Sequence, residues 1–181
     1  WLLKAEPNSR FVKGKDVKFS IDDFEAVKVS PWEGVRNYEA RNLLREMEIG
    51  DKALFYHSNC KCPGECWPSL QVSKKAYPDH TAWDESHPYY DPKTDRDNPR
   101  WYMPDVSFVT RVKYFVPLTL LKSIVSCSSP NDLGVGYIGD EGVAAVRAMT
   151  LITRGRLSVQ RVEEDAWKAI EALTTRGGWD E

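Results

Sequence analysis

The hexapeptide WEGVRN at residues 32–37 contains the side chains needed to hold a nucleobase. The indole of Trp32 can stack on a base for roughly 1–3 kcal/mol. The Arg36 guanidinium can pair with a phosphate or a base edge, and the Asn37 amide can donate and accept hydrogen bonds at once. The same residues fit a structural role, with Trp32 in the core, Gly34 in a turn and Asn37 as an N-cap. Taken alone, the hexapeptide favours the structural role.

An amphipathic helix is predicted directly after this hexapeptide, over residues 38–47. Ala40, Leu43, Leu44 and Met47 follow the i, i+3, i+4, i+7 pattern of one buried stripe, and the glycine at position 50 marks the end of the helix. The N–H groups at a helix N-terminus attract anions. The helix would place the hexapeptide at a point suited to bind a phosphate.

The other elements are predicted from periodicity and turn residues. Strands are expected at 1–5, 53–58, 70–77, 106–115 and 156–159, and helices at 20–27, 117–121 and 163–173. Residues 81–104 show little periodicity and predict a long ordered loop with a turn of helix, and loops of that length are often functional. Because strands and helices do not alternate regularly, the expected fold class is α+β, a compact β-barrel flanked by short helices.

Length and charge limit the architecture and the partners. The chain has 181 residues, 41% of them hydrophobic, which predicts one domain over 1–181, with the Gly- and Ser-rich segment 126–142 as a mobile insertion. A net charge of −2 argues against non-specific wrapping of duplex nucleic acid, so such a partner would need a local pocket. No apolar run reaches the ~20 residues of a membrane helix, and no membrane partner is expected. Because the chain begins at Trp1, we expect a trimmed domain with further segments unseen.

The four cysteines are expected to be free thiols, because a chain with a sizeable core does not need disulfides. Cys60, Cys62 and Cys66, with His57 nearby, resemble a zinc site superficially, but they lie in one short segment and lack a second ligand pair. The acidic residues of 79–97 lack the spacing of a calcium loop. We predict no metal and no cofactor.

Six motifs in a fixed order connect the chain with a known family. They are WLLKAEP at 1–7, WEGVRN at 32–37, FYHS at 55–58, AYPD at 76–79, DNPRW at 97–101 and RLSV at 156–159. In these motifs the chain resembles the EVE domain, and within that family the branch of the thymocyte nuclear proteins. The resemblance covers nearly the whole chain.

The resemblance implies a PUA-like fold and a non-enzymatic reader of modified nucleobases, cytosine derivatives such as 5-methylcytosine in DNA above all. Such a reader holds a flipped base in an aromatic-lined pocket. The resemblance also implies a nuclear location, with the cytoplasm as a second one, and we expect a monomer. Carried onto matching positions, the base-pocket candidates are Trp32, Val35, Asn37, Tyr56, His57 and Ser58.

Other candidates surround this pocket. Phosphate or base-edge contacts are expected from Lys4, Arg36, Arg154 and Arg156. For the last two residues, pairing with surface acids is an equally good interpretation. A second tier of candidates consists of Glu6, Trp101 and Asp105.

Two segments depart from the family pattern. Residues 64–69, GECWPS, are bulkier than the small, glycine-rich segment that family members commonly have there, which predicts a different pocket wall. Pro104 stands where the family usually has an apolar strand residue. Because proline removes a ladder donor, we expect this strand to begin no earlier than about Asp105.

The residues leave two other functions open. An enzyme acting on nucleotides or nucleic acid would use His57 as general base and Cys60 or Ser58 as nucleophile. Adjacent residues of a strand point to opposite faces, which disfavours a catalytic pair of His57 and Ser58. A protein-interaction module is the third hypothesis. A concave pocket floored by Trp32 would favour the reader.

Overall fold

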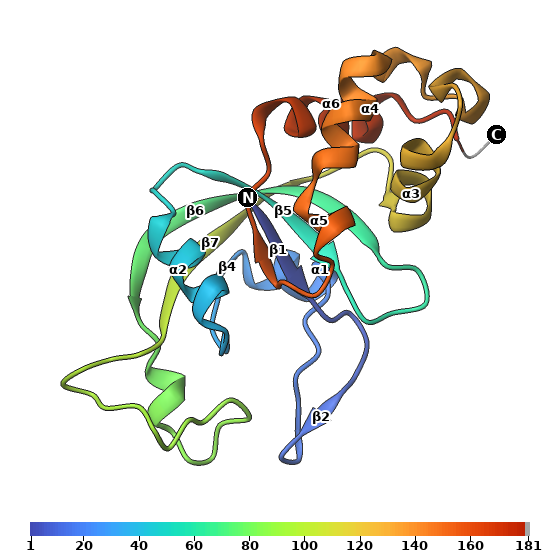
Figure 1. The fold of residues 1–181 in the computed structure, drawn as a ribbon. Helices are drawn as coiled ribbons and strands as arrows, with labels where there is room; N and C mark the ends of the chain where they lie inside the picture. Colours follow the sequence, from blue (N-terminus) through green and yellow to red (C-terminus); the bar gives the residue numbers. More distant parts are fainter. Residues whose placement is uncertain (180–181) are drawn as a thin grey trace.

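A computed structural model describes residues 1–179, and for residues 64–69 it describes the backbone alone. Its centre is a seven-stranded mixed sheet in the order β4-β7-β6-β5-β1-β9, with β8 paired to the start of β6 (Figure 1). A separate hairpin pairs β2, Phe11–Val12, with β3, Lys15–Asp16. The strands of the sheet are β1 Leu2–Ala5, β4 Val29–Pro31, β5 Lys52–His57, β6 Gly64–Pro78, β7 Tyr102–Arg111, β8 Val116–Pro117 and β9 Val159–Gln160.

The α+β class is confirmed, but the described strands do not close into the expected barrel. Strands β1 and β5 run parallel, whereas the other pairs of the sheet are antiparallel. The sheet ends at the short strands β4 and β9, and these two do not pair with each other within residues 1–179. The described sheet is therefore open.

The central strands β1 and β5 separate two hydrophobic cores. Because side chains alternate along a strand, Leu2, Leu54 and Tyr56 face one core while Leu3 and Phe55 face the other. The first core packs the sheet against the C-terminal helices, and the second packs it against α1 Ile21–Val27 and α2 Tyr38–Glu46. Both faces of β5, which overlaps the predicted strand 53–58, are therefore buried.

Both N-terminal helices begin where the sequence indicates. Ser20 caps α1, because its hydroxyl accepts from the Asp23 N–H and the Asp23 carboxylate accepts from the Ser20 N–H. Asn37 caps α2, and its Oδ1 accepts from the Ala40 N–H at 3.0 Å. The WEGVRN hexapeptide therefore lies directly before α2, as predicted.

The prediction that Pro104 delays the strand is wrong, because β7 begins at Tyr102. Lys74 pairs with Asp105 and Tyr77 with Met103, so two residues of β6 lie opposite the single Pro104. Such a bulge interrupts the ladder at a point where the missing N–H of proline costs no hydrogen bond. The carbonyl of Pro104 accepts from the Trp32 N–H at 2.8 Å.

The C-terminal third is mainly helical and contains α3 Leu118–Ser126, α4 Gly139–Ala148, α5 Thr150–Thr153 and α6 Glu164–Arg176. The segment 126–142, predicted to be a mobile insertion, forms the 3-10 helices η2 Pro130–Leu133 and η3 Gly136–Ile138 and the start of α4. Val135 is fully buried in the first core, and Leu133, Tyr137 and Ile138 pack against this core while partly buried. The mobility of the segment stays a prediction.

Candidate nucleic-acid interface

A cleft of about 980 Å³ opens at the N-terminal end of α2. Its sides come from residues 30–37, from residues 15–19 at the hairpin and from residues 87–89 of the long loop. In Figure 1 the hairpin and the loop between η1 His80–Trp83 and β7 project from the same end of the sheet, opposite α3, α4 and α6. The cleft lies between these two projecting segments.

Asp79 fixes the turn of the hexapeptide. Its buried carboxylate accepts from the Gly34 N–H at 3.0 Å, from Arg36 at 2.6 Å, and from the N–H and hydroxyl of Thr81. Burial alone would raise the pKa of Asp79, but the hydrogen bonds from Thr81 and Arg36 outweigh it and hold the pKa below its ordinary value. A charged Asp79 thus joins the hexapeptide to the start of the long loop.

Arg36, predicted as a phosphate or base-edge contact, is hydrogen-bonded within the chain. Besides Asp79, its guanidinium donates to the carbonyl of Tyr89 at 2.7 Å, to Thr81 Oγ1 at 3.1 Å and to the carbonyl of Val35 at 3.2 Å. Only 17% of the side chain is exposed. Because these donors are used within the chain, Arg36 braces the side of the cleft.

The ring of Tyr89 packs on the backbone of Gly34. Gly34 has a φ of +80°, and a Cβ atom there would lie 2.6 Å from the Tyr89 ring. Glycine alone meets both the backbone and the space requirement. The Tyr89 hydroxyl accepts from Arg10 at 3.2 Å, so the long loop also contacts the hairpin.

Trp32 lies mainly in the second core. Only 7% of the residue is exposed, and its ring meets Phe55 edge-on at 5.9 Å and Phe24 at 6.4 Å. Its small exposed part lines the cleft. An indole this buried offers a base an edge and not a whole free face, so the structural interpretation of Trp32 gains support.

Asn37 and Ser58 both line the cleft, together with Val35 and Trp32. The Oδ1 atom of Asn37 serves the α2 cap, so its Nδ2 donor is the group best suited to a ligand. The Ser58 hydroxyl donates to the carbonyl of Ala5 at 3.2 Å and can still accept. These four candidates are therefore brought together around one cleft.

Basic side chains outnumber acidic ones around the cleft, which Glu6, Asp16 and Glu33 also line. Lys4, Lys15, Lys18 and Arg156 all line it. Lys18 forms an ion pair with Asp23 at 3.2 Å. Arg156 is exposed and makes no hydrogen bond or ion pair with the side chains that the structure describes. The cleft thus combines an apolar side with a basic rim, which suits an anionic ligand with a flat apolar group.

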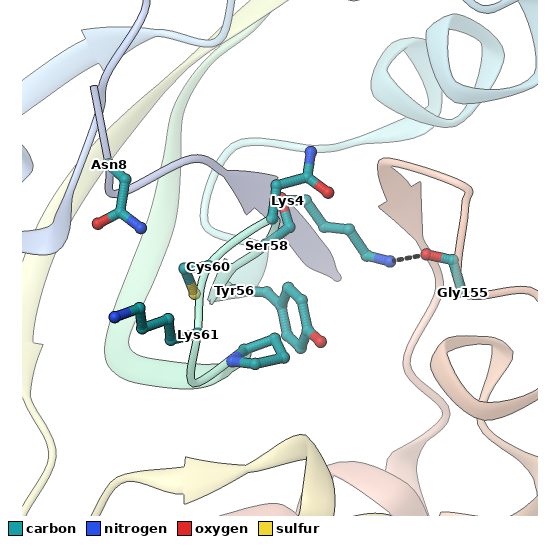
Figure 2. Close-up of a pocket in the computed structure, with 9 residues that line it drawn as sticks. Lys4, Asn8, Tyr56, Ser58, Cys60, Lys61 and Gly155 are labelled. Atoms are coloured by element: carbon teal, nitrogen blue, oxygen red, sulfur yellow. Dashed lines mark hydrogen bonds between the residues drawn. The ribbon is translucent and has the colours of Figure 1, made fainter. Parts of the chain in front are cut away.

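A second cavity of about 630 Å³ adjoins the cleft and shares Lys4, Ser58, Asn59 and Gly155 with it (Figure 2). The Lys4 Nζ atom donates to the carbonyl of Gly155 at 2.6 Å and lies 5.1 Å from the centre of the Tyr56 ring. Tyr56 is 3% exposed and belongs to the first core. The candidate Tyr56 therefore borders this second cavity and not the cleft beside Trp32.

Three candidates, Arg154, Trp101 and Asp105, lie outside both cavities and have partners in the fold, and their role as ligand contacts stays a prediction. Arg154 forms two bonds with the Glu39 carboxylate, at 2.6 and 2.7 Å, which agrees with the surface-pair alternative. The two second-tier residues are also engaged: the Trp101 indole donates to Asp91 at 2.7 Å, and Asp105 accepts from the Tyr77 hydroxyl at 2.6 Å. The remaining second-tier residue, Glu6, lines the cleft and pairs with Arg10.

His57 also lies outside both cavities. Its Nε2 atom accepts from the Ile21 N–H at 3.2 Å, and its ring meets Phe55 edge-on at 5.4 Å. Burial lowers the pKa of His57 below its ordinary value, against the opposing charge of Asp22. A neutral imidazole thus holds α1 against β5. Since Ser58 bonds to Ala5 instead, the geometry gives no support to a catalytic base and nucleophile.

The described side chains do not test the predicted absence of a metal at the cysteine cluster. Among the side chains that the structure describes, no group of three or more His, Cys, Asp or Glu could hold a metal ion. Cys60 and Cys62 are free thiols. The side chain of Cys66, and with it the predicted difference in the pocket wall at 64–69, lies outside the described residues. The absence of a metal stays a prediction.

A family model described as EVE domain matches residues 1–173. The chain belongs to the EVE domain family. Human thymocyte nuclear protein 1 is 43% identical over 175 residues, which cover 96% of this chain and 72% of that protein. A crystal structure of human THYN1 in complex with DNA that contains 5-methylcytosine matches with a TM-score of 0.83 and 43% identity over 96% of each chain. A hypothetical protein from Leishmania major matches with a TM-score of 0.76 and 41% identity, over 96% of this chain and 92% of that one.

The cleft of this EVE domain includes residues that the motifs did not indicate. Phe19, Lys15 and Lys18 come from the hairpin and the segment after it, and Tyr89 comes from the long loop. The length of that loop was the only signal for Tyr89. Asp79 accepts from the nearby Thr81 N–H, and its bond to Arg36 joins residues 43 positions apart.

Proposed function

We propose that this EVE domain is a non-enzymatic DNA reader that accepts a flipped, modified cytosine, such as 5-methylcytosine, in the cleft at α2. The observation that carries this proposal is the combination, in one cleft, of an apolar side, hydrogen-bonding groups and a basic rim. The human THYN1 complex with 5-methylcytosine DNA supports this class of ligand. An acidic chain is compatible with it, because base flipping puts recognition into a pocket and not along the phosphates.

Each part of the cleft has a role in this proposal. The base ring lies between the exposed edge of Trp32 and Tyr89, with its methyl group near Val35. Asn37 and Ser58 contact its Watson–Crick edge, and Arg156 contacts a flanking phosphate. Burying one methyl group contributes about 0.8 kcal/mol, which corresponds to a preference of roughly fourfold for 5-methylcytosine over cytosine.

We further propose that the domain acts in the nucleus and binds as a monomer. The nuclear location rests on the name of the thymocyte nuclear proteins to which the chain is similar. Within residues 1–179 no helix is long and apolar enough to span a bilayer.

The proposal is tested by titrating two labelled duplexes that differ only in one cytosine or 5-methylcytosine. The wild type should prefer the methylated duplex by a few-fold. Ser158→Phe, which adds a ring inside the cleft, should weaken binding and remove the preference. Thr110→Phe, an exposed change on β7 outside the cleft, is the matched control and should behave as wild type. Equal wild-type affinity for both duplexes would reject the proposal.

A further inference from the structure

Phe11 is the most exposed large hydrophobic side chain among the described residues, at 70%. It lies on β2, directly opposite Asp16 of β3, and Asp16 lines the cleft. Nothing in the core contacts of the fold requires a phenyl ring at this position. A single exposed hydrophobic side chain is ordinary by itself, but Phe11 lies next to the cleft in which we propose that DNA binds.

The charges around Phe11 indicate which partner this is. The hairpin segment 10–18, RFVKGKDVK, contains four basic residues and one acidic residue, in a chain whose net charge is −2. An apolar side chain surrounded by cations matches a surface of phosphates with an apolar interior, which is the surface of a nucleic-acid duplex. A hydrophobic protein partner would gain nothing from these cations.

The hairpin is also held in place across the cleft. Arg10 donates to the Tyr89 hydroxyl at 3.2 Å, Lys15 donates to Ser86 at 3.4 Å, and the Lys13 Nζ atom lies 5.3 Å from the centre of the Tyr90 ring. All three partners belong to the long loop on the other side of the cleft. Phe11 is therefore presented by a hairpin that contacts the opposite side of the cleft.

Base flipping would give such a side chain a role. A base that leaves the stack exposes apolar surfaces in the duplex, and proteins that deform DNA insert Phe, Leu or similar side chains between base steps. We propose that Phe11 enters the duplex beside the flipped cytosine and fills the space that the base leaves. This inference rests on the proposed function, since without a flipped base there is no space to fill.

The experiment compares Phe11→Ala, Phe11→Leu and the wild type on three DNAs that contain 5-methylcytosine. These are a fully paired duplex, the same duplex with an abasic site opposite 5-methylcytosine, and the single strand. On the paired duplex Phe11→Ala should bind about tenfold more weakly, while Phe11→Leu stays close to wild type. On the single strand, which has no duplex stack to fill, Phe11→Ala should match wild type. On the abasic duplex, where the flipped base still leaves a space, Phe11→Ala should again bind more weakly than wild type.

The matched control is Phe115→Ala, which removes another exposed phenyl ring, 37% exposed, that does not line the cleft. It should bind all three DNAs as wild type does. Thermal melting checks that every variant is folded. A 2-aminopurine next to 5-methylcytosine should brighten when wild type binds the paired duplex, and it should brighten less with Phe11→Ala.

The outcomes separate the two proposals. If wild type does not distinguish 5-methylcytosine from cytosine and leaves 2-aminopurine unchanged, the proposed function fails and the role of Phe11 fails with it. If wild type prefers 5-methylcytosine and brightens 2-aminopurine, but Phe11→Ala binds the paired duplex as well as wild type does, only the role of Phe11 is overturned. An equal loss on all three DNAs would also overturn it, because a general contact would then explain the effect.

Discussion

The two sides of the cleft are built in opposite ways. On one side, the braced wall, residues 32–37 are held by Asp79, Arg36 and Tyr89 through buried hydrogen bonds. On the other side, the hairpin wall, residues 10–19 are mostly exposed and rich in lysine. In the braced wall the side chains that shape the cleft also hold the fold together, whereas the side chains of the hairpin wall are mostly exposed. Substitutions should therefore change stability on the first side and affinity on the second.

Trp32→Ala should give the largest effect. Replacing a buried tryptophan by alanine costs about 3–5 kcal/mol of the free energy of unfolding, and Trp32 packs on Phe24 and Phe55. The measurement is urea unfolding followed by circular dichroism. Trp32→Phe, which keeps an aromatic ring in the core, should lose much less. A Trp32→Ala protein as stable as wild type would show that Trp32 is an open platform and not part of the core.

Asp79→Ala should give the second-largest loss of stability. Removing one partner of a buried ion pair costs about 3–5 kcal/mol, and the value should lie near the lower end because Arg36 remains partly exposed. The control is Glu39→Ala, which breaks the exposed pair with Arg154 and should leave the unfolding midpoint unchanged. If both variants lose the same stability, the braced wall does not depend on Asp79.

Lowering the pH should reduce the contribution of Asp79 to the free energy of unfolding in a defined pH range. Because the pKa of Asp79 is lower in the folded protein than its ordinary value of about 3.9, its contribution to stability is complete above that value and is lost as the pH falls through the folded pKa. The free energy of unfolding should therefore fall more steeply below about pH 4 in wild type than in Asp79→Asn. Parallel curves for the two proteins would contradict this account.

A smaller effect is expected at the hairpin wall. Lys15→Gln should leave stability unchanged, because the side chain is exposed. We expect the Lys15 ammonium, whose bond to Ser86 is long at 3.4 Å, to contact a phosphate in the complex. Lys15→Gln should therefore reduce the slope of log affinity against log salt by about 1, as expected for one lost phosphate contact. The wild-type slope should be shallower than about −5. A steeper wild-type slope, or an unchanged slope in Lys15→Gln, would show that phosphates are bound elsewhere.

Features set by neighbouring residues could be predicted from the sequence. The Ser20 and Asn37 caps and the buried stripe of α2 follow local rules of hydrogen bonding and periodicity. The resemblance to the EVE domain placed Trp32, Val35, Asn37 and Ser58 at one site, and all four line the cleft.

Features set by distant residues could not be predicted. The bond from Arg36 to Asp79 and the packing of Tyr89 on Gly34 depend on how the long loop returns to the hexapeptide. Without that contact, Arg36 looks available for a phosphate. The place of Pro104 in β7 could not be predicted for the same reason. It depends on a bulge in β6, and the residues next to Pro104 in the sequence give no sign of that bulge.

In the proposed complex, the cleft beside α2 receives the modified base. Nuclear Overhauser contacts can show whether the base lies there. In a complex with duplex DNA that carries an isotope-labelled methyl group on a single 5-methylcytosine, the methyl protons should show contacts to Val35, Trp32 and Tyr89. A methyl group that keeps its contacts to the neighbouring bases of the duplex, and shows none to these residues, would contradict the account.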